Sequence, residues 1–469
     1  MVNRSNSLRA WIIGIGLLSI ACIVLFLQMK NPHHQKGNQV KSQFVKSQSG
    51  KIKIVECIPM DTTILLERDY VYQKLEPRTG AYLGAYIEQA TWLYADPQRF
   101  NRITGKAHAS FFKYVGYGKP FPADWVERVK ASGAVPHIAW EPNDGLHSVR
   151  DDAYLRAFVR AAGEADVPIF LRFASEMNGN WTAYSGVPDL YKEKWRLVQR
   201  LLRAHAPKVA MVWTVFPTPE RTIADYYPGD EYVDWVGVNV YNVAFHNDDL
   251  QQPADHEDPL KLLDYTYRMF SVRKPIQVSE FGVSHFSSTD GKVRVEYAKN
   301  KLSRMYGGLQ HHYPRVKAIF YFDVNNLLNA PAHRRINNYA VTAQPQMLAH
   351  YQQLVANPHF LQRVENQEGR RGRETFSYRG MMFQRDGVVY VDGQFFRDYL
   401  GMSMSWHPHA VTLEKAGLRL RVPVVRALLA NGGDGGAQRR VFGLPLRQTA
   451  EHFGYVLDVE RAGAILKIR

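Results

Sequence analysis

Short apolar runs alternate with amphipathic segments through the middle of this 469-residue chain. Eight runs, each bounded by turn residues, have the length and composition of buried strands. They cover residues 81–88, 108–115, 135–140, 168–174, 209–216, 233–241, 275–279 and 318–323. Segments with helical spacing of apolar residues lie between them, at 124–132, 151–165, 190–205, 259–273 and 293–313. This alternation predicts an α/β domain, a (β/α)8 TIM barrel, at residues 75–357.

A doubly wound open sheet is the alternative architecture for such an alternation. That fold brings a glycine-rich phosphate-binding turn after its first strand. The corresponding stretch here, Leu83-Gly84-Ala85-Tyr86, is no such turn. The barrel is therefore the favoured prediction.

An apolar run at Leu8–Leu27, with Arg4 and Arg9 at its start, is long enough to cross a bilayer. Residues 1–30 are either a signal-anchor helix or the core of a signal peptide. We favour an anchor that attaches the protein to the cell membrane and places its body outside the cytoplasm, and a secreted protein is the alternative. The polar segment 31–55 is typical of a solvated linker.

The chain carries a formal net charge of +15, a property that nucleic-acid-binding proteins share. The excess is strong in the N-terminal tail and after residue 360, and no nucleic-acid motif is present. A basic surface facing an anionic cell envelope explains the charge as well, so we expect no nucleic-acid partner. The two cysteines, Cys22 and Cys57, offer the body no internal disulfide.

Two glutamates follow apolar runs about a hundred residues apart. Glu176 comes after the run at 168–174 and before the turn Met177–Asn180, and Glu280 ends the run that begins at Pro275. In a (β/α)8 barrel the strands deliver their carboxyl ends to one mouth, where active sites are built. We therefore expect both carboxyl groups in one cleft.

Glycoside cleavage uses one protonated carboxyl group and one carboxylate. Glu176, in apolar and aromatic surroundings, suits the general acid/base because burial keeps a carboxyl pKa high. Glu280 suits the nucleophile, held ionised by donors such as Arg172 or Tyr241. The plainer interpretation of either residue is a surface glutamate or a buried ion-pair partner; the pair at strands four and seven favours catalysis.

Further side chains at the predicted strand ends are candidate sugar contacts. The aromatic candidates for stacking are Trp140, Trp181, Tyr184 and Trp213, each of which could instead be core packing. Arg172 and Asn178 either bind sugar hydroxyls or orient Glu176. Strand six delivers Asn239 and Tyr241, and strand eight delivers Tyr321.

The run from Arg172 to Trp181, RFASEMNGNW, resembles the acid/base motif of glycoside hydrolase family 26, the β-mannanase family, R-x-x-H-E-M-N-G-x-W. Val278–Gly282 is similar to the nucleophile strand of that family, and the resemblance extends over about residues 80–355. It implies a retaining (β/α)8 endo-glycosidase that acts on β-linked mannan, mixed-linkage glucan, xylan or a related exopolysaccharide, with Glu176 as acid/base and Glu280 as nucleophile.

Two departures from the family pattern bear on specificity. Ser175 stands where the family has histidine, and Tyr321-Phe322 stands where a tryptophan is often found near the end of strand eight. Both catalytic carboxyl groups are kept. Mannan is therefore left open as the substrate, while glycosidase chemistry is retained.

After residue 357 the pattern changes, and an Arg-rich polar stretch leads to a small α+β module at 376–469. A weak repeat, 391–401 and 444–454, predicts a short helix that ends at glycine and is followed by strands. It is similar to the copper amine oxidase N-terminal-like stalk module, a similarity that names a fold only and implies no copper. We expect the module to attach the protein to the cell wall or a polymer. We read His407 and His409 as a solvated turn, and we expect no metal and no cofactor.

The leading hypothesis is thus a cell-surface endo-β-glycosidase. The alternative is a non-catalytic carbohydrate-binding or envelope-scaffold protein built on a degenerate barrel. The departure from the family motif at Ser175 is consistent with this alternative. An esterase would require a serine nucleophile or a metal triad, and the sequence has no G-x-S-x-G motif.

Overall fold

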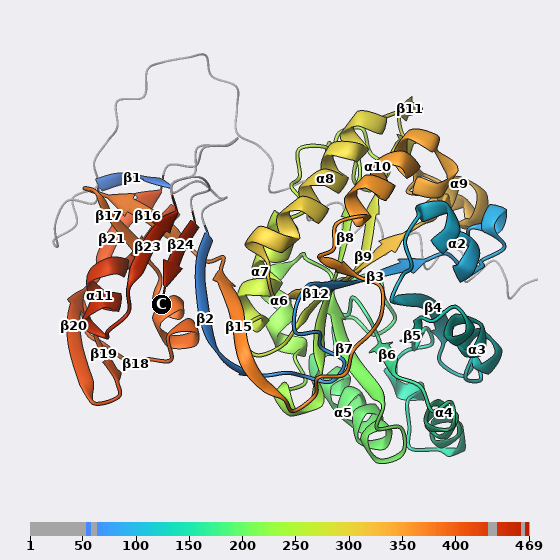
Figure 1. Cartoon of the computed structure of the whole chain (residues 1–469), viewed down its shortest axis with the longest axis horizontal. Coiled ribbons are helices and arrows are strands. Elements are labelled where there is room, and N and C mark those ends of the chain that lie inside the picture. Colours follow the sequence, from blue (N-terminus) through green and yellow to red (C-terminus); the bar gives the residue numbers. More distant parts are fainter. Residues whose placement is uncertain (1–52, 58–62, 430–438, 461–464, 469) are drawn as a thin grey trace, which may run out of the picture. The chain divides into compact units, whose positions relative to one another are not determined.

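The computed structural model describes residues 53–57, 63–429, 439–460 and 465–468 (Figure 1). Within them eight parallel strands pair in the order β3-β4-β5-β6-β7-β8-β9-β12, and β12 pairs with β3 to close a barrel. The strands are β3 (Ala81–Tyr86), β4 (Ser110–Gly116), β5 (Val135–Glu141), β6 (Ile169–Phe173), β7 (Val209–Val215), β8 (Trp235–Asn242), β9 (Ile276–Val283) and β12 (Val316–Phe322). The predicted barrel is confirmed, with strand ends shifted by at most a few residues.

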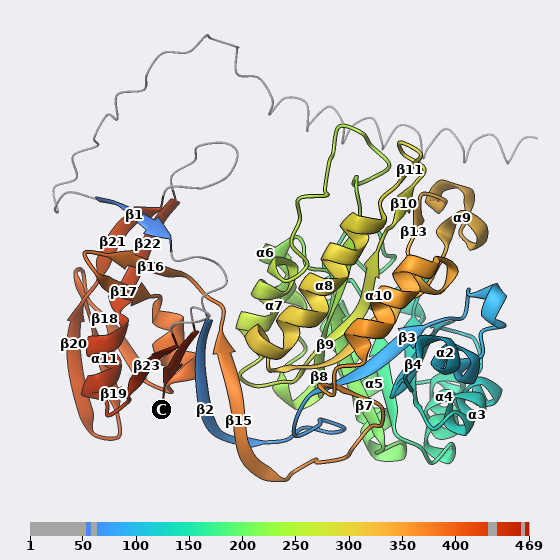
Figure 2. The same cartoon turned by 45° about the horizontal axis from the view of Figure 1, so that its top comes forward.

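Helices cover the outer face of the barrel sheet (Figures 1 and 2). They are α2 (Pro97–Thr104), α3 (Ala123–Ala131), α4 (Ala153–Glu164), α5 (Pro188–His205), α6 (Glu220–Ile223), α7 (Lys261–Phe270), α8 (Val295–His312), α9 (Asn326–Asn329) and α10 (Pro345–Val355). The five predicted helices correspond to α3, α4, α5, α7 and α8. The sequence interpretation missed α2 and α10, as well as the four-residue helices α6 and α9.

Short elements decorate the loops of the barrel. The single-turn helices are Thr91–Leu93, Leu146–Ser148, Ala224–Tyr226, Asp230–Tyr232, Ala332–Arg334 and Val341–Ala343. The short strands β10 (Phe286–Ser287), β11 (Lys292–Val293) and β13 (Asn337–Asn338) form a small sheet, and β14 (Phe360–Leu361) adds a parallel pairing to β3.

Local sequence explains where two of the helices begin. Asp96 precedes α2 and accepts a hydrogen bond from the Gln98 backbone amide, and Pro97 occupies the first helical position. Asp152 caps α4 in the same way, through the Leu155 amide. A side-chain acceptor at the cap satisfies an amide that has no partner within the helix, so both starts are encoded locally.

The barrel has an inner and an outer core. Large rings from β3, β4, β6, β8 and β12 fill the interior, among them Tyr82, Phe112, Phe170, Trp235 and Phe320. Gly84 admits the Phe320 ring, because a Cβ at Gly84 would lie 2.3 Å from that ring. Aliphatic and aromatic side chains of the opposite strand faces pack against the helices in a larger cluster. The strands are therefore buried on both faces, which is why their sequences are continuous apolar runs.

The C-terminal part of the chain forms a separate set of sheets with one short helix, α11 (Leu446–His452). Its strands are β15 (Arg371–Tyr378), β16 (Met382–Arg385), β17 (Val388–Val391), β18 (Ser403–Trp406), β19 (Ala410–Lys415), β20 (Leu418–Pro423), β21 (Val425–Leu429), β22 (Arg439–Pro445), β23 (Leu457–Glu460) and β24 (Ile465–Ile468). Each predicted repeat unit contains a short helical segment, a glycine with positive φ and a strand: Phe395–Tyr399, Gly401 and β18, then α11, Gly454 and β23. The likeness to a stalk module stays a prediction.

Two strands from before the barrel complete these sheets. Strand β1 (Lys53–Cys57) pairs with β16 and β21, and β2 (Thr63–Val71) pairs with β15 and β24. The sequence interpretation ended its linker at residue 55 and began the module at 376, so it missed this contribution. The module is discontinuous in sequence because the barrel is inserted between its strands.

The predicted apolar run at Leu8–Leu27 lies outside the described residues and stays a prediction. Among the residues that the structure describes, no helix combines the length and apolar character needed to span a membrane.

Candidate active site

Glu176 lies in a tight turn that follows β6. Its backbone amide donates to the Thr214 carbonyl of β7 at 3.0 Å. Both Ala174 and Glu176 have positive φ, +49° and +59°, a conformation that residues other than glycine rarely adopt. The turn thereby directs the Glu176 side chain to the barrel mouth instead of along the strand.

Glu280 lies within β9, beside a bulge. The register of β8 and β9 runs from Val238↔Val278 to Asn239↔Glu280, so Ser279 has no partner. Ser279 reaches Thr214 at 3.1 Å inside the barrel, and Glu280 also faces inward. An unbulged strand would send consecutive side chains to opposite faces. The bulge is what directs Glu280 into the site.

Three donors converge on the Glu280 carboxylate, which is 4% exposed. Tyr114 donates to Oε1 at 2.5 Å and Arg172 Nη1 donates to Oε1 at 2.7 Å. Tyr241 donates to Oε2. Hydrogen bonds to the charged form of a carboxyl group favour ionisation. The surroundings of Glu280 are those of a carboxylate, as the sequence predicted for Arg172 and Tyr241.

The three donors keep their protons in this environment. Burial raises the pKa of the Tyr114 and Tyr241 hydroxyls well above 10, and the charge of Glu280 raises them further. Burial alone would lower the pKa of Arg172, but the charge and hydrogen bond of Glu280, together with Tyr114 and Glu141, outweigh burial and raise that pKa. The guanidinium is fully buried and lies over the Phe112 ring, 4.7 Å from its centroid. Arg172 therefore acts on Glu280 and makes no hydrogen bond to Glu176.

Glu176 has a different environment. Asn239 Nδ2 donates to its Oε1 at 2.7 Å, and Trp181 Nε1 donates to its Oε2 at 2.8 Å. Burial raises the pKa of the Glu176 carboxyl from 4.5 to about 7, the charge of Glu280 raises it too, and the two hydrogen bonds oppose the shift. At neutral pH a substantial fraction of this carboxyl is protonated, as a general acid requires.

The two carboxyl groups belong to one network. Asn239 links them, because its Nδ2 reaches Glu176 while its Oδ1 accepts from Arg172 Nη1 at 3.3 Å. The same Arg172 nitrogen donates to Glu280. Through this proximity the charge of Glu280 contributes to the raised pKa of the Glu176 carboxyl.

Several predicted sugar contacts are instead structural. Trp140 is fully buried, with its ring stacked on Phe158 at 3.8 Å, and Trp213 is fully buried against Tyr227 and Phe270. A buried ring presents no face to a sugar, so both stacking predictions are wrong. Both rings point from their strands toward the helices and pack in the outer core.

The predicted sugar contacts of Tyr321 and Asn178 are also wrong, because both side chains are buried. Tyr321 is fully buried and its hydroxyl donates to the Tyr339 carbonyl at 2.7 Å. Asn178 is 2% exposed and bonds the Phe216 backbone in both directions, at 2.9 and 3.0 Å. Asn178 therefore fixes the turn after Glu176 to the end of β7 and leaves no polar group for a sugar hydroxyl.

Trp181 and Tyr184 differ in their accessibility. The Trp181 ring is 48% exposed and meets Phe216 edge-on with ring centroids 5.0 Å apart, so it can offer a face to a sugar next to Glu176. Tyr184 is 4% exposed, with its hydroxyl 2.7 Å from Glu141 Oε2 and 2.8 Å from the Ser175 carbonyl. The predicted stacking role of Tyr184 is therefore wrong; the residue supports the turn.

Two residues of the site were missed. Tyr114, on β4, is the third donor to Glu280 and is 38% exposed. Glu141, at the end of β5, accepts from the Ser175 backbone amide at 3.0 Å. The alternation of β4 could have placed Tyr114 inside the barrel mouth, because Phe112 two residues earlier is an interior ring. Glu141 directly follows the predicted strand 135–140, so the sequence placed it near the site. Nothing in the sequence indicated its hydrogen bond to the Ser175 backbone amide.

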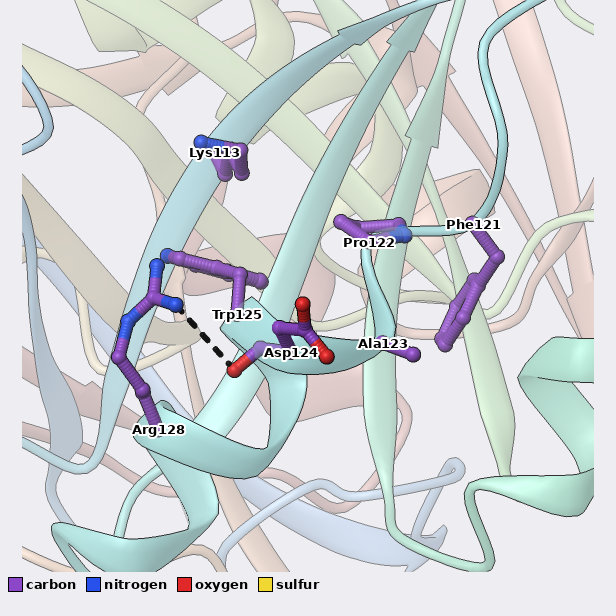
Figure 3. A pocket seen from close by; sticks show the side chains of 7 residues that line it. All are labelled: Lys113, Phe121, Pro122, Ala123, Asp124, Trp125 and Arg128. Atoms are coloured by element: carbon purple, nitrogen blue, oxygen red, sulfur yellow. Dashed lines mark hydrogen bonds between the residues drawn. The ribbon is translucent and has the colours of Figure 1, made fainter.

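A separate hollow of about 300 Å³ lies between β4 and the start of α3. Figure 3 shows its lining side chains, with Arg128 donating to the Asp124 carbonyl. It contains neither glutamate and none of the predicted site residues. Within the ranges that the structure describes, no group of three or more His, Cys, Asp and Glu side chains is placed to hold a metal ion.

The geometry can perform acid-assisted displacement at a carbon centre. A buried carboxylate with three donors can attack or stabilise a cationic centre, and a neighbouring carboxyl with raised pKa can protonate a leaving oxygen. Exposed Trp181 stands beside the acid.

Parts of the chain are similar in sequence to known glycoside hydrolases. Residues 154–280 match the family model described as Glycosyl hydrolase family 26, a segment that contains Glu176 and ends at Glu280. The matched segment covers about a quarter of the chain.

Curated relatives share parts of the sequence. The β-1,3-xylanase TXYA of a Vibrio species is 33% identical over 142 residues, which are 28% of this chain and 29% of that protein. A mannan endo-1,4-β-mannosidase of Bacillus subtilis is 28% identical over 128 residues, 25% of this chain and 31% of that protein. The chain thus spans less than a third of the length of either relative.

A solved structure of a modular endo-β-1,4-mannanase from Cellulomonas fimi aligns with 80% of this chain and 99% of its own, with 16% identity and a TM-score of 0.46.

Proposed function

We propose that this chain is a glycosyl hydrolase family 26 enzyme, an endo-β-glycosidase that cleaves a β-linked polysaccharide by double displacement. Glu280 is the nucleophile and Glu176 the general acid/base. The observation that carries the proposal is the contrast between two linked carboxyl groups. Glu280 accepts from Tyr114, Arg172 and Tyr241, whereas burial raises the pKa of Glu176 to about 7.

In the first step a Glu280 oxygen bonds to the anomeric carbon while the bond to the leaving oxygen breaks. Glu176 gives its proton to that oxygen, and the aglycone part of the polymer departs. In the second step Glu176, now ionised, takes a proton from water. The water oxygen bonds to the anomeric carbon, and the Glu280 ester breaks with net retention of configuration.

The departures from the family motif and the activities named for the relatives bear on which polysaccharide is cleaved. Ser175 replaces a histidine of the mannanase motif, and curated relatives with similar sequences are named as β-1,3-xylanase and as mannanase. We therefore place β-1,3-xylan beside mannan and mixed-linkage β-glucan as candidate substrates.

The test is release of reducing ends from β-1,3-xylan, mannan, lichenan and bacterial exopolysaccharides. We expect the parent protein to act on at least one polymer, and Glu176→Ala and Glu280→Ala each to lose about a thousandfold or more of that rate. Glu127→Ala, a change of an exposed carboxylate on α3, is the matched control and keeps the parent rate.

Two results would contradict the proposal. Full activity in Glu280→Ala would remove the assigned nucleophile. Binding of a polymer by the parent without any release of reducing ends would favour the non-catalytic carbohydrate-binding alternative.

We also propose that the enzyme works outside the cytoplasm. The support is the apolar run at Leu8–Leu27 with basic residues at its start. Cell fractionation with protease treatment of intact cells tests this, and a protein found wholly in the cytoplasmic fraction would contradict it.

A further inference from the structure

The backbone around Glu176 is strained. Ala174 and Glu176 both adopt left-handed φ although neither is glycine. A left-handed φ is unfavourable for a residue with a side chain, and it persists only where the surrounding contacts hold it in place. The direction of the Glu176 carboxyl therefore depends on whatever holds the intervening residue, Ser175.

Two side chains hold the Ser175 backbone, one on each side. Glu141 Oε2 accepts from the Ser175 amide at 3.0 Å. The Tyr184 hydroxyl lies 2.8 Å from the Ser175 carbonyl and 2.7 Å from the same Glu141 oxygen. Burial raises the pKa of the Tyr184 hydroxyl well above 10, and the charge of Glu141 raises it further, so the hydroxyl remains a donor.

The backbone amides of the two flanking residues, Ala174 and Glu176, donate to backbone carbonyls. The Ala174 amide donates to the Trp140 carbonyl at 3.1 Å, and the Glu176 amide donates to the Thr214 carbonyl at 3.0 Å. Those bonds continue the barrel ladder. The bonds from Glu141 and Tyr184 are the additional contacts at the residue that joins the two left-handed positions.

We propose that Glu141 and Tyr184 are positioning residues, which hold the Ser175 peptide and thereby aim the Glu176 carboxyl at the glycosidic oxygen. This inference rests on the proposed function of Glu176. Neither side chain takes part in bond making or breaking. They act through the turn, and the reaction step that depends on them is the transfer of the Glu176 proton.

The poorer the leaving group, the more its departure depends on proton transfer to the leaving oxygen. A polysaccharide or a 4-methylumbelliferyl glycoside needs more help from the acid than a 2,4-dinitrophenyl glycoside, whose phenolate departs largely without it. A misplaced acid therefore lowers the rate with the first kind of substrate far more than with the second. General damage to the fold lowers both equally.

The experiment compares Glu141→Ala, Glu141→Gln and Tyr184→Phe with the parent on these two aryl glycosides, made with the sugar of the most active polymer. We expect Glu141→Ala to lose about 10- to 100-fold in kcat/KM with the 4-methylumbelliferyl substrate and less than about threefold with the dinitrophenyl substrate, since kcat/KM reports the step in which the leaving group departs. Tyr184→Phe shows the same pattern more weakly. Glu141→Gln recovers most of the loss, because its amide oxygen can accept from the Ser175 amide.

Asp323→Ala is the control for structural damage. Asp323 is a fully buried carboxylate just after β12 that accepts from the Thr342 amide at 3.1 Å, outside the network of the two glutamates. Its loss destabilises the barrel without changing the ratio of the two aryl-glycoside rates.

Two outcomes overturn the inference: an equal loss with both leaving groups in Glu141→Ala, or no loss with either. The proposed function fails separately, if Glu176→Ala itself shows no dependence on the leaving group. Thermal unfolding of each variant shows whether a uniform loss of rate comes from unfolded protein.

Discussion

Glu176 and Glu280 are the same residue type in one network, and their neighbours give them different chemistry. Arginine and two tyrosines surround Glu280, whereas an amide and an indole meet Glu176. A guanidinium favours ionisation far more than a neutral N–H donor does. The assignment of nucleophile and acid follows from these neighbours.

The raised pKa of Glu176 has a consequence for stability that does not depend on activity. The folded protein binds this proton up to about pH 7 and the unfolded chain only up to about 4.5, so stability of the parent falls as pH rises between these values. Replacing Glu176 with Gln removes that loss. Relative to the parent, Glu176→Gln should become more stable by up to roughly 3 kcal/mol between pH 4 and pH 8.

Urea unfolding at pH 4, 6 and 8 checks this. Glu164→Gln, on α4, is the comparison variant and should show no such trend. A constant difference between Glu176→Gln and the parent across the three pH values would contradict a raised pKa.

Substitution of Trp181 and of Trp213 should distinguish a role in substrate binding from a role in core packing. Trp181→Ala should raise KM for oligosaccharides about tenfold with a small change in stability, since its ring is half exposed beside Glu176. Trp213→Phe should lower the free energy of unfolding by about 1 to 2 kcal/mol and leave KM unchanged, since its ring is fully buried in the outer core. Steady-state kinetics and urea unfolding of both variants test the pair. Equal changes of KM in Trp181→Ala and Trp213→Phe would contradict the assignment of Trp181 to substrate binding and of Trp213 to the core.

At the scale of elements, the bulge in β9 places two consecutive side chains inside the barrel. Gly237 on the neighbouring β8 faces the same interior. A Cβ at Gly237 would lie 2.3 Å from both the Thr214 and the Ser279 hydroxyl oxygens. This close approach explains why a glycine occupies the middle of a buried strand.

Gly237→Ala should therefore destabilise the barrel by about 1 to 3 kcal/mol, through overpacking next to the bulge. Gly307→Ala is the matched control, because Gly307 is exposed in α8 and a Cβ there meets nothing within 4 Å. Alanine at a helical glycine of this kind stabilises by up to about 1 kcal/mol. The melting temperatures of the two variants should shift in opposite directions. An unchanged melting temperature for Gly237→Ala would show that β8 moves enough to accommodate the added methyl group.

The sequence predicts the barrel well because both strand faces are buried and each apolar run is uninterrupted. It does not predict the bulge, which arises from the pairing of β8 with β9 and has no local signature. For that reason Glu280 could be assigned to a strand end and to two of its donors, Arg172 and Tyr241, but not to the third, Tyr114. The errors at Trp140 and Trp213 have a related cause: sequence shows that a ring lies on a strand, not which face of the barrel it takes.

At the scale of the whole molecule, strands from both sides of the barrel segment share one sheet. Strand β2 lies between β15 and β24 in the order β15-β2-β24-β23. Its side chains Ile64 and Leu66 belong to the same apolar cluster as Phe376 and Ile468. The sequence interpretation missed this because pairing between distant segments leaves no periodic signal in either one.

Removal of residues 1–74 should therefore destabilise the C-terminal sheets, since β15 and β24 would each lose a paired strand. Limited proteolysis should then cut within 371–468, where a chain lacking only residues 1–52 resists. Equal resistance of the two shortened chains would show that β1 and β2 are dispensable.

The central claim, that Glu280 attacks and Glu176 delivers and recovers the proton, is tested most directly by azide rescue. Glu176→Ala and Glu280→Ala are each incubated with azide and the 2,4-dinitrophenyl β-glycoside of the preferred sugar, and the glycosyl azide formed is identified by proton NMR. The account predicts the β-azide from Glu176→Ala, since azide there replaces water in attack on the glycosyl enzyme. It predicts the α-azide from Glu280→Ala, where azide replaces the nucleophile. The reverse pattern, or β-azide from both variants, would contradict it.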